Sequence, residues 1–226
     1  MEISDGVPKQ TMVENEEVYP KEIIDGLKTI PLSANSSLRL FRIRSCPTSF
    51  LHACAMEILA SRKTLLHEKP SFKCYGKICH QQRSVGFFSD VVKEYCYSNS
   101  QFRANPLTPG LQFILQEVNV ACESKFDGIL VNVYDNGKDY ISPHADDEKE
   151  LDLHAGVVTI SVGAERLFRI RDKNTKKLIY ETPLVNGSCV QMLGKCQEEF
   201  THDIPMQRKI TDWRLSYTLR KHCKDV

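Results

Sequence analysis

The sequence predicts an α+β protein whose second half folds as a β-sandwich or jelly roll. Apolar residues recur at helical spacing after residue 47 and again after residue 109. From residue 128 onward the pattern changes to short runs rich in β-branched residues, separated by turn residues. The chain has 226 residues, of which 41% are hydrophobic, and this suffices for one sizeable core. Because no internal repeat or second boundary is visible, we expect a single domain over 23–226.

The first half contains one predicted strand and two predicted helices. Residues 38–43 alternate apolar and polar side chains, which is typical of a strand. A helix is expected to begin with Thr48 or Ser49 as its cap, and apolar residues continue at helical spacing as far as Leu66. In the second helix Thr108 is the expected cap and Pro109 the first helical residue. Its apolar face comprises Leu111, Ile114, Leu115, Val118 and Ala121.

Six strands are predicted after the second helix. Turn residues at 172–174 and 186–187 separate some of them. The runs that read as strands cover residues 129–134, 156–162, 167–170, 178–180, 188–192 and 213–220.

The segment from about 67 to 108 lacks strong periodicity and is rich in Lys, Arg, Gln and aromatic residues. Aromatic residues interleaved with basic ones suit stacking on bases with charge to phosphates. Ordinary packing of loops over the mouth of a barrel explains the same composition, and composition alone slightly favours it.

Charge is distributed unevenly along a chain whose net charge is only +1. Residues 1–22 contain six acidic residues and two lysines, a net charge of −4, which leaves +5 for the remainder. We expect 1–22 to be a flexible acidic tail. Basic clusters at 173–177, 208–209 and 220–221 are compatible with contact to a phosphate backbone, and equally with solvated basic loops.

Composition also excludes several classes of protein. The nine cysteines are scattered without a Cys-x-x-Cys pair, which favours reduced thiols over a disulfide scaffold. Cys74, Cys79 and His80 lack a second pair of ligands, so a zinc site is not expected there. No apolar run is long enough to cross a bilayer, and the N-terminus is not a signal peptide. We therefore expect a soluble intracellular protein with no membrane partner.

One constellation carries chemistry. His144 and Asp146 are two residues apart, so in extended chain both side chains leave the same face, and His202 lies far downstream. Two imidazoles and one carboxylate are the ligand set of a mononuclear non-haem iron(II) site, which leaves open positions for substrate chemistry. His-x-Asp alone is a weak signal, because such pairs occur by chance.

The last predicted strand strengthens this interpretation. Alternation places Arg214, Ser216, Thr218 and Arg220 on one face, opposite an aromatic and aliphatic face. Burial of two guanidinium groups is costly unless they bind an anion, and a small dicarboxylic acid reaching from the metal to this row would satisfy both ends. An exposed strand face is the alternative; it is fair for Arg220 and weaker for Arg214, which lies between Trp213 and Leu215.

Taken together, these motifs resemble the AlkB family of iron(II)- and 2-oxoglutarate-dependent dioxygenases. The resemblance runs from about residue 72 to 221, and the combination of motifs is specific although no single motif is. Within the family it is nearest to the branch that repairs duplex DNA, because similar residues occur at 75–77, 82–83, 95–98 and 146–151. The motifs that carry it are Asn132-x-Tyr134, His144-x-Asp146, His202 and Arg214-x-Ser216-x-Thr218-x-Arg220.

The resemblance implies a double-stranded β-helix, or jelly-roll, core at about 128–221, with flanking N-terminal helices and a nucleotide-recognition lid at about 67–108. It implies that His144, Asp146 and His202 bind iron. The cosubstrate 2-oxoglutarate and O2 would complete the chemistry, with ascorbate as the reductant in vitro. The residues expected to contact 2-oxoglutarate are Asn132, Tyr134, Arg214, Ser216, Thr218 and Arg220.

The implied reaction is oxidative demethylation of N-alkylated bases of the 1-methyladenine or 3-methylcytosine type in DNA, with release of succinate, carbon dioxide and formaldehyde. The target base must leave its stack to reach the metal. Tyr75 would fill the gap as a wedge, Glu148 would contact the base edge, and a carboxylate there would favour a cationic base. The other residues expected to bind substrate are Arg83, Tyr95, Tyr97 and Ser98. A solvated loop acid is the alternative for Glu148, and a packed aromatic for Tyr75.

Two departures from the family pattern have consequences. The family usually has Asn at the position of Ser216, so we expect cosubstrate binding to be weakened and retained. A Pro-Arg step common in the lid is Gln82-Arg83 here, which leaves lid shape and strand preference open. A genome-repair role implies a nuclear protein in a eukaryote, with the cytoplasm as the alternative, and we expect a monomer.

Three rival functions fit parts of the sequence. An RNA demethylase of the same family, including the AlkB domains of plant-virus replicases, has the same core motifs. A nucleic-acid-binding module without catalysis is disfavoured because all three expected ligands are present. A protein hydroxylase on the same scaffold is disfavoured by the basic and aromatic lid.

Overall fold

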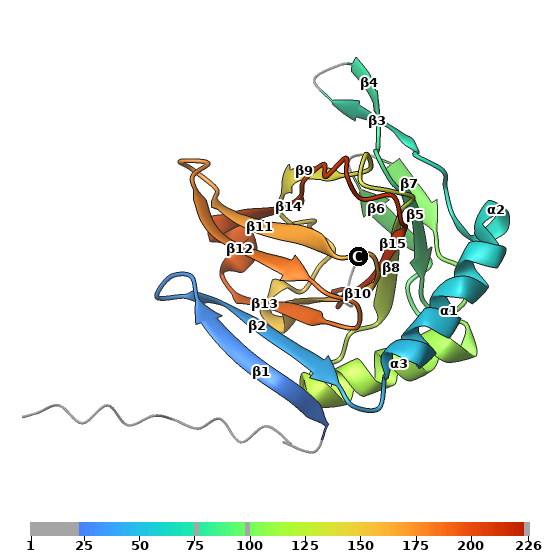
Figure 1. Cartoon of the computed structure of the whole chain (residues 1–226), viewed down its shortest axis with the longest axis horizontal. Coiled ribbons are helices and arrows are strands. Elements are labelled where there is room, and N and C mark those ends of the chain that lie inside the picture. The colour runs from blue at the N-terminus through green and yellow to red at the C-terminus, as the bar shows by residue number, and fades with distance from the viewer. Residues whose placement is uncertain (1–22, 75–76, 98–99, 224–226) are drawn as a thin grey trace, which may run out of the picture.

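Two antiparallel sheets and a layer of helices make up the computed structural model, which describes residues 23–74, 77–97 and 100–223 (Figure 1). The large sheet has seven strands in the order β1-β2-β13-β10-β15-β8-β5, and the small sheet has four in the order β12-β11-β14-β9. The strands of the large sheet are β1 (Ile24–Pro31), β2 (Ser36–Ile43), β13 (Cys189–Gly194), β10 (Val157–Gly163), β15 (Arg214–Arg220), β8 (Gly128–Tyr134) and β5 (Ser84–Phe88). Those of the small sheet are β12 (Leu178–Leu184), β11 (Arg166–Asp172), β14 (Phe200–Ile204) and β9 (Ile141–His144).

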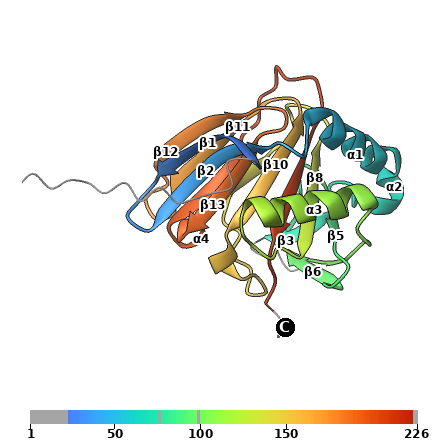
Figure 2. The ribbon, with the colours of Figure 1, turned by 90° about the horizontal axis from the view of Figure 1, so that it is seen from below.

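Helices cover one face of the large sheet, and the small sheet covers the other (Figures 1 and 2). The outer core joins the apolar sides of α1 (Thr48–Ala60) and α3 (Pro109–Ala121) to β8, β10 and β15. Leu215, Tyr217 and Leu219 belong to this core, as their alternation in the sequence predicts. The inner core lies between the sheets and contains Phe168 and Ile170 of β11 and Val190 and Met192 of β13. The predicted jelly-roll core is confirmed.

Shorter elements complete the described chain. The hairpin β3 (Ser71–Cys74) and β4 (Lys77–His80) projects from the body, and β6 (Glu94–Tyr97) pairs with β7 (Ser100–Arg103) (Figure 1). The remaining helices are α2 (Arg62–Leu65), a 3-10 turn at Leu153–Ala155 and α4 (Cys196–Glu199). None of the described helices is both long and apolar enough to cross a membrane.

The second predicted helix is confirmed in detail, and the first needs correction. Thr108 caps α3 by accepting a hydrogen bond from the backbone N–H of Leu111, and Pro109 opens the helix. In α1, by contrast, Pro47 occupies the cap position without a side-chain hydrogen bond. The first helix ends at Ala60, and a separate turn of helix, α2, follows.

Sequence patterns did not predict two kinds of strand: those with both faces exposed and those with both faces buried. β1 is an edge strand with mostly exposed side chains, so it shows no alternating pattern. β5 lies inside the segment expected to be loops, yet all five of its residues are buried and it pairs with β8 in the large sheet. A strand that is buried on both sides gives a continuous apolar run, which is too short here to be recognised.

Candidate metal centre

The three predicted metal ligands meet at one end of the small sheet. His144 is the last residue of β9 and pairs directly with His202 of β14. Asp146 follows two residues later, with its Oδ1 3.7 Å from His144 Nε2 and its Oδ2 3.8 Å from His202 Nε2. One ligand atom from each residue can be chosen so that all lie within 4.8 Å of one another. This spacing suits a single ion held between them.

Burial keeps both imidazoles neutral. Desolvation, with a contribution from His202, lowers the pKa of His144 to about 3, although Asp146 opposes the shift. Desolvation together with the nearby cations Arg220 and Arg83 lowers the pKa of His202 to about 3. A neutral imidazole has a free lone pair, which is the form that binds a metal.

The hydrogen bond made by His144 also selects the nitrogen available to a metal. His144 Nδ1 lies 3.0 Å from the carbonyl oxygen of Ser142. Because a carbonyl can only accept, Nδ1 carries the proton, and Nε2 therefore presents its lone pair toward Asp146.

The polar face of β15 is buried. Arg214, Ser216, Thr218 and Arg220 are all at most 6% exposed, so the alternative of an exposed strand face is wrong. Antiparallel pairing places Arg214 opposite Tyr134 and Ser216 opposite Asn132. On the other side of β15, Ser161 of β10 lies opposite Ser216. The inner face of the large sheet therefore carries a continuous row of polar groups.

Arg214 is a buried cation without a carboxylate partner among the described residues. Its Nη2 donates to Ser161 Oγ at 2.8 Å, whereas Nε and Nη1 have no hydrogen-bond partner in the described part of the chain. Burial lowers the pKa of Arg214 to about 10, and the nearby Arg166 cation acts in the same direction. An arginine in this condition fits a bidentate carboxylate, as 2-oxoglutarate would supply.

Arg166 is a further buried guanidinium in this region, and sequence reasoning missed it. Its Nη2 donates to the backbone carbonyls of Asp139 and Pro205, both at 2.7 Å. Arg166 and Arg214 both lie against the ring of Tyr134, with their guanidinium carbons 5.6 and 5.2 Å from the ring centroid. Since Arg166 follows an ordinary turn and opens an alternating strand, nothing in the sequence separates it from a surface arginine.

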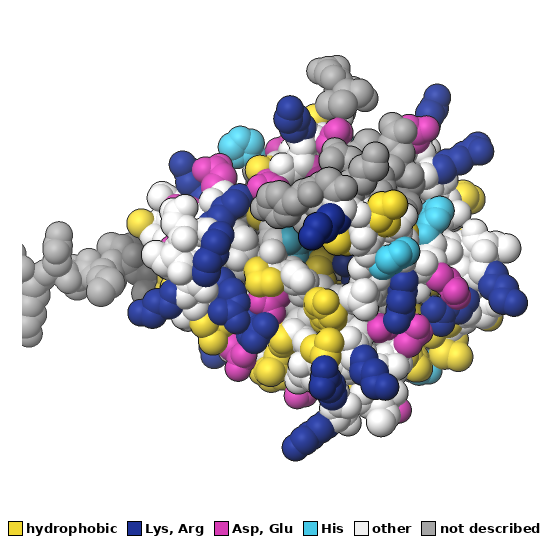
Figure 3. All heavy atoms as spheres, turned by 90° about the horizontal axis from the view of Figure 1, so that it is seen from above, with side chains coloured by type: hydrophobic (Ala, Val, Ile, Leu, Met, Phe, Trp, Pro, Cys, Tyr) yellow, Lys and Arg dark blue, Asp and Glu magenta, His cyan; other side chains and the backbone are white. Residues whose placement is uncertain are grey.

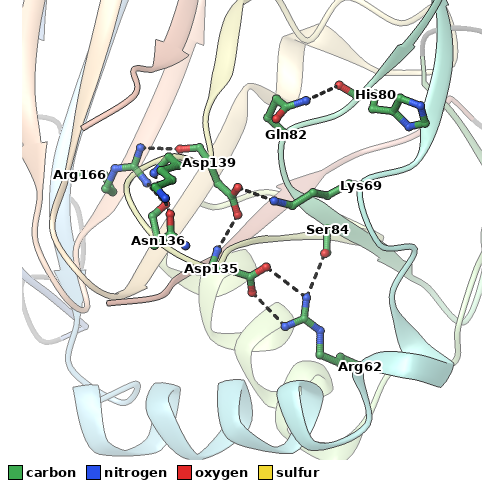
Figure 4. Close-up of polar contacts among 10 residues, drawn as sticks. Arg62, Lys69, His80, Gln82, Ser84, Asp135, Asn136, Asp139 and Arg166 are labelled. Atoms are coloured by element: carbon green, nitrogen blue, oxygen red, sulfur yellow. Dashed lines mark hydrogen bonds and ion pairs between the residues drawn. The ribbon is translucent and has the colours of Figure 1, made fainter. Parts of the chain in front are cut away.

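A network of polar contacts holds the loop after β8, and this loop supplies carbonyls to Arg166 (Figure 4). Asp139, which is 3% exposed, accepts from Lys69 Nζ at 2.7 Å and from the backbone N–H of Asp135 at 2.8 Å. Asp135 in turn pairs with Arg62 of α2 at 2.9 Å. The loop after β8 is therefore held from outside the sheet by Arg62 of α2 and by Lys69 of the loop that follows α2.

The metal cluster and the polar row face the same cavity between the two sheets. Its apolar walls include Leu130, Phe168 and Leu184. Thr159 is a further polar residue of the lining that sequence reasoning missed, and its Oγ1 lies 3.3 Å from Thr218 Oγ1. The predicted site residues that line the cavity are Arg83, Asn132, Tyr134, His144, Asp146, His202, Arg214, Ser216, Thr218 and Arg220.

Of the residues predicted to bind substrate, the structure describes the side chains of only two, Arg83 and Glu148. Arg83 is 4% exposed and its Nε donates to Asn132 Oδ1 at 2.7 Å, so it lies beside the polar row rather than on an outer loop. Glu148 has a side chain that is 15% exposed, with Oε1 3.5 Å from Arg220 Nη1, so it is not a solvated loop acid. Tyr75 and Ser98 lie outside the described residues. Tyr95 and Tyr97 belong to β6, whose backbone is described and whose side chains at these positions are not. Their roles stay predictions.

Comparison with known proteins gives the family. The model of the 2OG-Fe(II) oxygenase superfamily matches residues 53–220, which is most of the chain and includes every residue that lines the cavity. The chain belongs to the 2OG-Fe(II) oxygenase superfamily. The cofactors of this superfamily are Fe(II), 2-oxoglutarate and O2, as the resemblance to the AlkB family implies.

Relatives within the superfamily confirm the resemblance to AlkB. The human protein named DNA oxidative demethylase ALKBH2 is 28% identical over 154 residues, which cover 65% of this chain and 59% of that protein. Human alpha-ketoglutarate-dependent dioxygenase alkB homolog 3 is 28% identical over 149 residues, 62% of this chain and 51% of the relative. The chain thus matches less than two thirds of the length of these curated relatives.

The fold has a solved counterpart. The structure of OsALKBH1 superposes with a TM-score of 0.57 at 16% identity, over 86% of this chain and all of that one. At this identity the similarity concerns the fold, which it supports independently of the sequence motifs.

The residues of the cavity fit the cofactors of the superfamily. Two neutral imidazoles and a buried carboxylate match the donor set of iron(II). At the other end of the row, Arg214 Nε and Nη1, which have no partner within the described ranges, match a carboxylate. When bound, iron and 2-oxoglutarate supply the oxidising chemistry, and the chain supplies ligands, orientation and charge.

Proposed function

We propose that this protein removes methyl groups oxidatively from N-alkylated bases of the 1-methyladenine or 3-methylcytosine type in DNA. It would consume O2 and 2-oxoglutarate and release succinate, carbon dioxide and formaldehyde. The proposal rests mainly on one observation: His144, Asp146 and His202 share a cavity with Arg214, a buried arginine that has no carboxylate partner among the residues that the structure describes. The relatives named as demethylases support the class of reaction.

The chain's own groups would act mainly by orientation and charge. Arg214 would hold the distal carboxylate of 2-oxoglutarate, with the Tyr134 ring packed against its guanidinium. Asn132, Ser216 and Thr218 would add hydrogen bonds from the neighbouring strands. Arg220 would favour the other carboxylate near the metal, where it already pairs with Asp146. These side chains are buried, so their polar contacts act in a low dielectric.

Glu148 supports the choice of a cationic base. Its carboxylate follows Asp146 by two residues and lies against Arg220, so it stands close to the metal end of the cavity. A base methylated at a ring nitrogen, such as 1-methyladenine, is positively charged, and a nearby carboxylate stabilises it relative to a neutral base.

Surface charge supports contact with a polynucleotide only in part. Figure 3 shows Lys and Arg side chains scattered over one face with acidic residues between them. Lys173 pairs with Asp147 and Lys221 with Asp152, so these cations are partly neutralised. The exposed pairs Lys176-Lys177 and Arg208-Lys209 are better placed to meet phosphates.

The specific choice of substrate and setting belongs to the proposal. We favour DNA over RNA because ALKBH2 relatives carry the name DNA oxidative demethylase. An RNA demethylase of the same family is the alternative, and it has the same core residues. A nuclear location and a monomeric state are part of the same proposal.

A ranking of substrates tests this choice. Demethylation of one 1-methyladenine sequence would be followed by mass spectrometry as duplex DNA, single-stranded DNA and single-stranded RNA at equal concentrations and salt. We expect both DNA forms to be repaired with a higher kcat/KM than the RNA. Faster demethylation of RNA than of either DNA form would replace the DNA proposal with the RNA alternative. Succinate formation without demethylation of any of the three would keep the oxygenase and discard nucleobases as its substrate.

A further inference from the structure

Gln197 of the short helix α4 reaches the metal centre from outside the cavity. It is 4% exposed, and its Oε1 accepts a hydrogen bond from the backbone N–H of Asp146 at 2.8 Å. Its Nε2 is used as well, because it lies 3.4 Å from the Met192 sulfur. Both ends of a buried amide are thus occupied, and one of them holds the main chain of a predicted metal ligand.

The position of Asp146 explains why such a contact is needed. The pairing of β9 with β14 ends at His144 and His202, so Asp146 lies beyond the last pair of the ladder. Its side chain must nevertheless reach the same point as the two imidazoles. The Gln197 side chain accepts the hydrogen bond that the Asp146 N–H would otherwise donate to a neighbouring strand. This contact fixes the direction in which the Asp146 side chain points from the backbone.

A second clamp joins the same two segments. Lys173 Nζ donates to Asp147 Oδ2 at 2.8 Å and to the backbone carbonyl of Gln197 at 3.0 Å. α4 also leads directly into β14, which carries His202. One short helix is therefore tied both to the segment that holds Asp146 and to the strand that holds His202.

We propose that Gln197 is a positioning residue of the metal centre, which holds the Asp146 backbone so that its carboxylate shares an ion with His144 and His202. The inference rests on the ligand assignment made in the proposed function. It concerns the affinity for metal, so it can be tested without substrate or turnover.

The test compares binding of Co(II), a spectroscopic stand-in for Fe(II), to the apo protein by titration of its visible absorption. Gln197→Met keeps the length of the side chain and removes the acceptor for the Asp146 N–H. Cys196→Ala is the matched control, since Cys196 is buried in the same helix and its thiol contacts the Ser37 carbonyl instead. We expect Gln197→Met to weaken Co(II) binding by about 10- to 100-fold, the usual effect of losing such an outer contact. Cys196→Ala should bind Co(II) as the wild type does.

Wild-type Co(II) affinity in a folded Gln197→Met protein would overturn the proposal. If that variant fails to fold, Lys173→Met removes the other clamp at a partly exposed position. Unchanged affinity in Lys173→Met would then count against the positioning role, and weakened affinity would support it. Failure of the ligand assignment gives a different result, because Asp146→Ala would then bind Co(II) as tightly as the wild type.

Discussion

Arg220 and Asp146 form a buried ion pair in which Arg220 Nη2 lies 2.5 Å from Asp146 Oδ1. Both side chains are at most 4% exposed. Arg220 of β15, the last strand in the chain, thus supplies the countercharge for the Asp146 carboxylate. A metal ion at this place would offer a second countercharge to the same carboxylate.

Replacement of Arg220 by Met should therefore destabilise the apo protein more than the metal-loaded protein. Removing one partner of a buried ion pair costs about 3–5 kcal/mol, because the other charge stays buried without compensation. A bound divalent ion restores that compensation. Urea unfolding of wild type and Arg220→Met, each with EDTA or with Mn(II), measures the difference. An equal loss of stability in both conditions would contradict the role of Asp146 as a ligand.

Replacement of Arg214 by Met should raise the KM for 2-oxoglutarate. A hydrogen bond to a charged group is worth about 1.5–3 kcal/mol, which corresponds to about a 10- to 150-fold change. The KM for the oligonucleotide should change little, because Arg214 lies at the opposite end of β15 from Arg220, which Glu148 contacts. The control is Arg62→Met, which removes an arginine of α2 that pairs with Asp135 outside the cavity. An unchanged cosubstrate requirement in Arg214→Met would remove Arg214 from its assigned role.

Replacement of Glu148 by Gln should reduce the preference for cationic bases. The amide keeps the shape of the side chain and loses its charge, so kcat/KM should fall more for 1-methyladenine than for the neutral base 1-methylguanine. The two oligonucleotides would be compared in one sequence context at constant salt. Equal reductions for both bases would indicate that Glu148 acts by structure alone.

The two cluster histidines should make the apo protein sensitive to mild acid. In the folded state their pKa values lie at about 3, against an ordinary value of 6.5. As pH falls through 6.5, the unfolded chain takes up protons that the folded chain does not, so stability falls with pH. Two such groups contribute a slope of at most about 2.7 kcal/mol per pH unit.

Urea unfolding in EDTA between pH 7.5 and 5.0 measures this slope. Two acidic residues should not interfere, because both lose their charge below this pH range. A hydrogen bond from Lys221 lowers the pKa of Asp152, and hydrogen bonds from Ser33 and Ser36 lower the pKa of Glu199. The double variant His144→Gln, His202→Gln should show a shallower dependence on pH. The same dependence in wild type and double variant would show that other groups cause the acid sensitivity.

Most residues of the site could be predicted from the sequence, because strand alternation and motif spacing pointed to the same residues. Arg214 to Arg220 alternate with core residues, and the alternation fixed which side chains face inward. The strand pairing that places His144 opposite His202 was not predicted, since it depends on which strands become neighbours.

What the sequence left out depends on tertiary packing. β5 gave no periodic pattern because both of its faces are buried. Arg166 is bound by backbone carbonyls of loops at 136–139 and 205, which no spacing rule brings together. Gln197 lies 51 residues along the sequence from Asp146, whose N–H donates to it, so its role becomes visible only in the folded chain.

Joint release of succinate and formaldehyde from DNA that contains 1-methyladenine would test the proposed demethylation. The reaction would contain Fe(II), ascorbate and 2-oxoglutarate, with His144→Ala as the matched protein. We expect the wild type to release the two products in equal amounts, only with added iron, and His144→Ala to release neither. If folded, iron-loaded wild type forms neither product, the protein is not a demethylase of this DNA, and a binding module without catalysis is favoured.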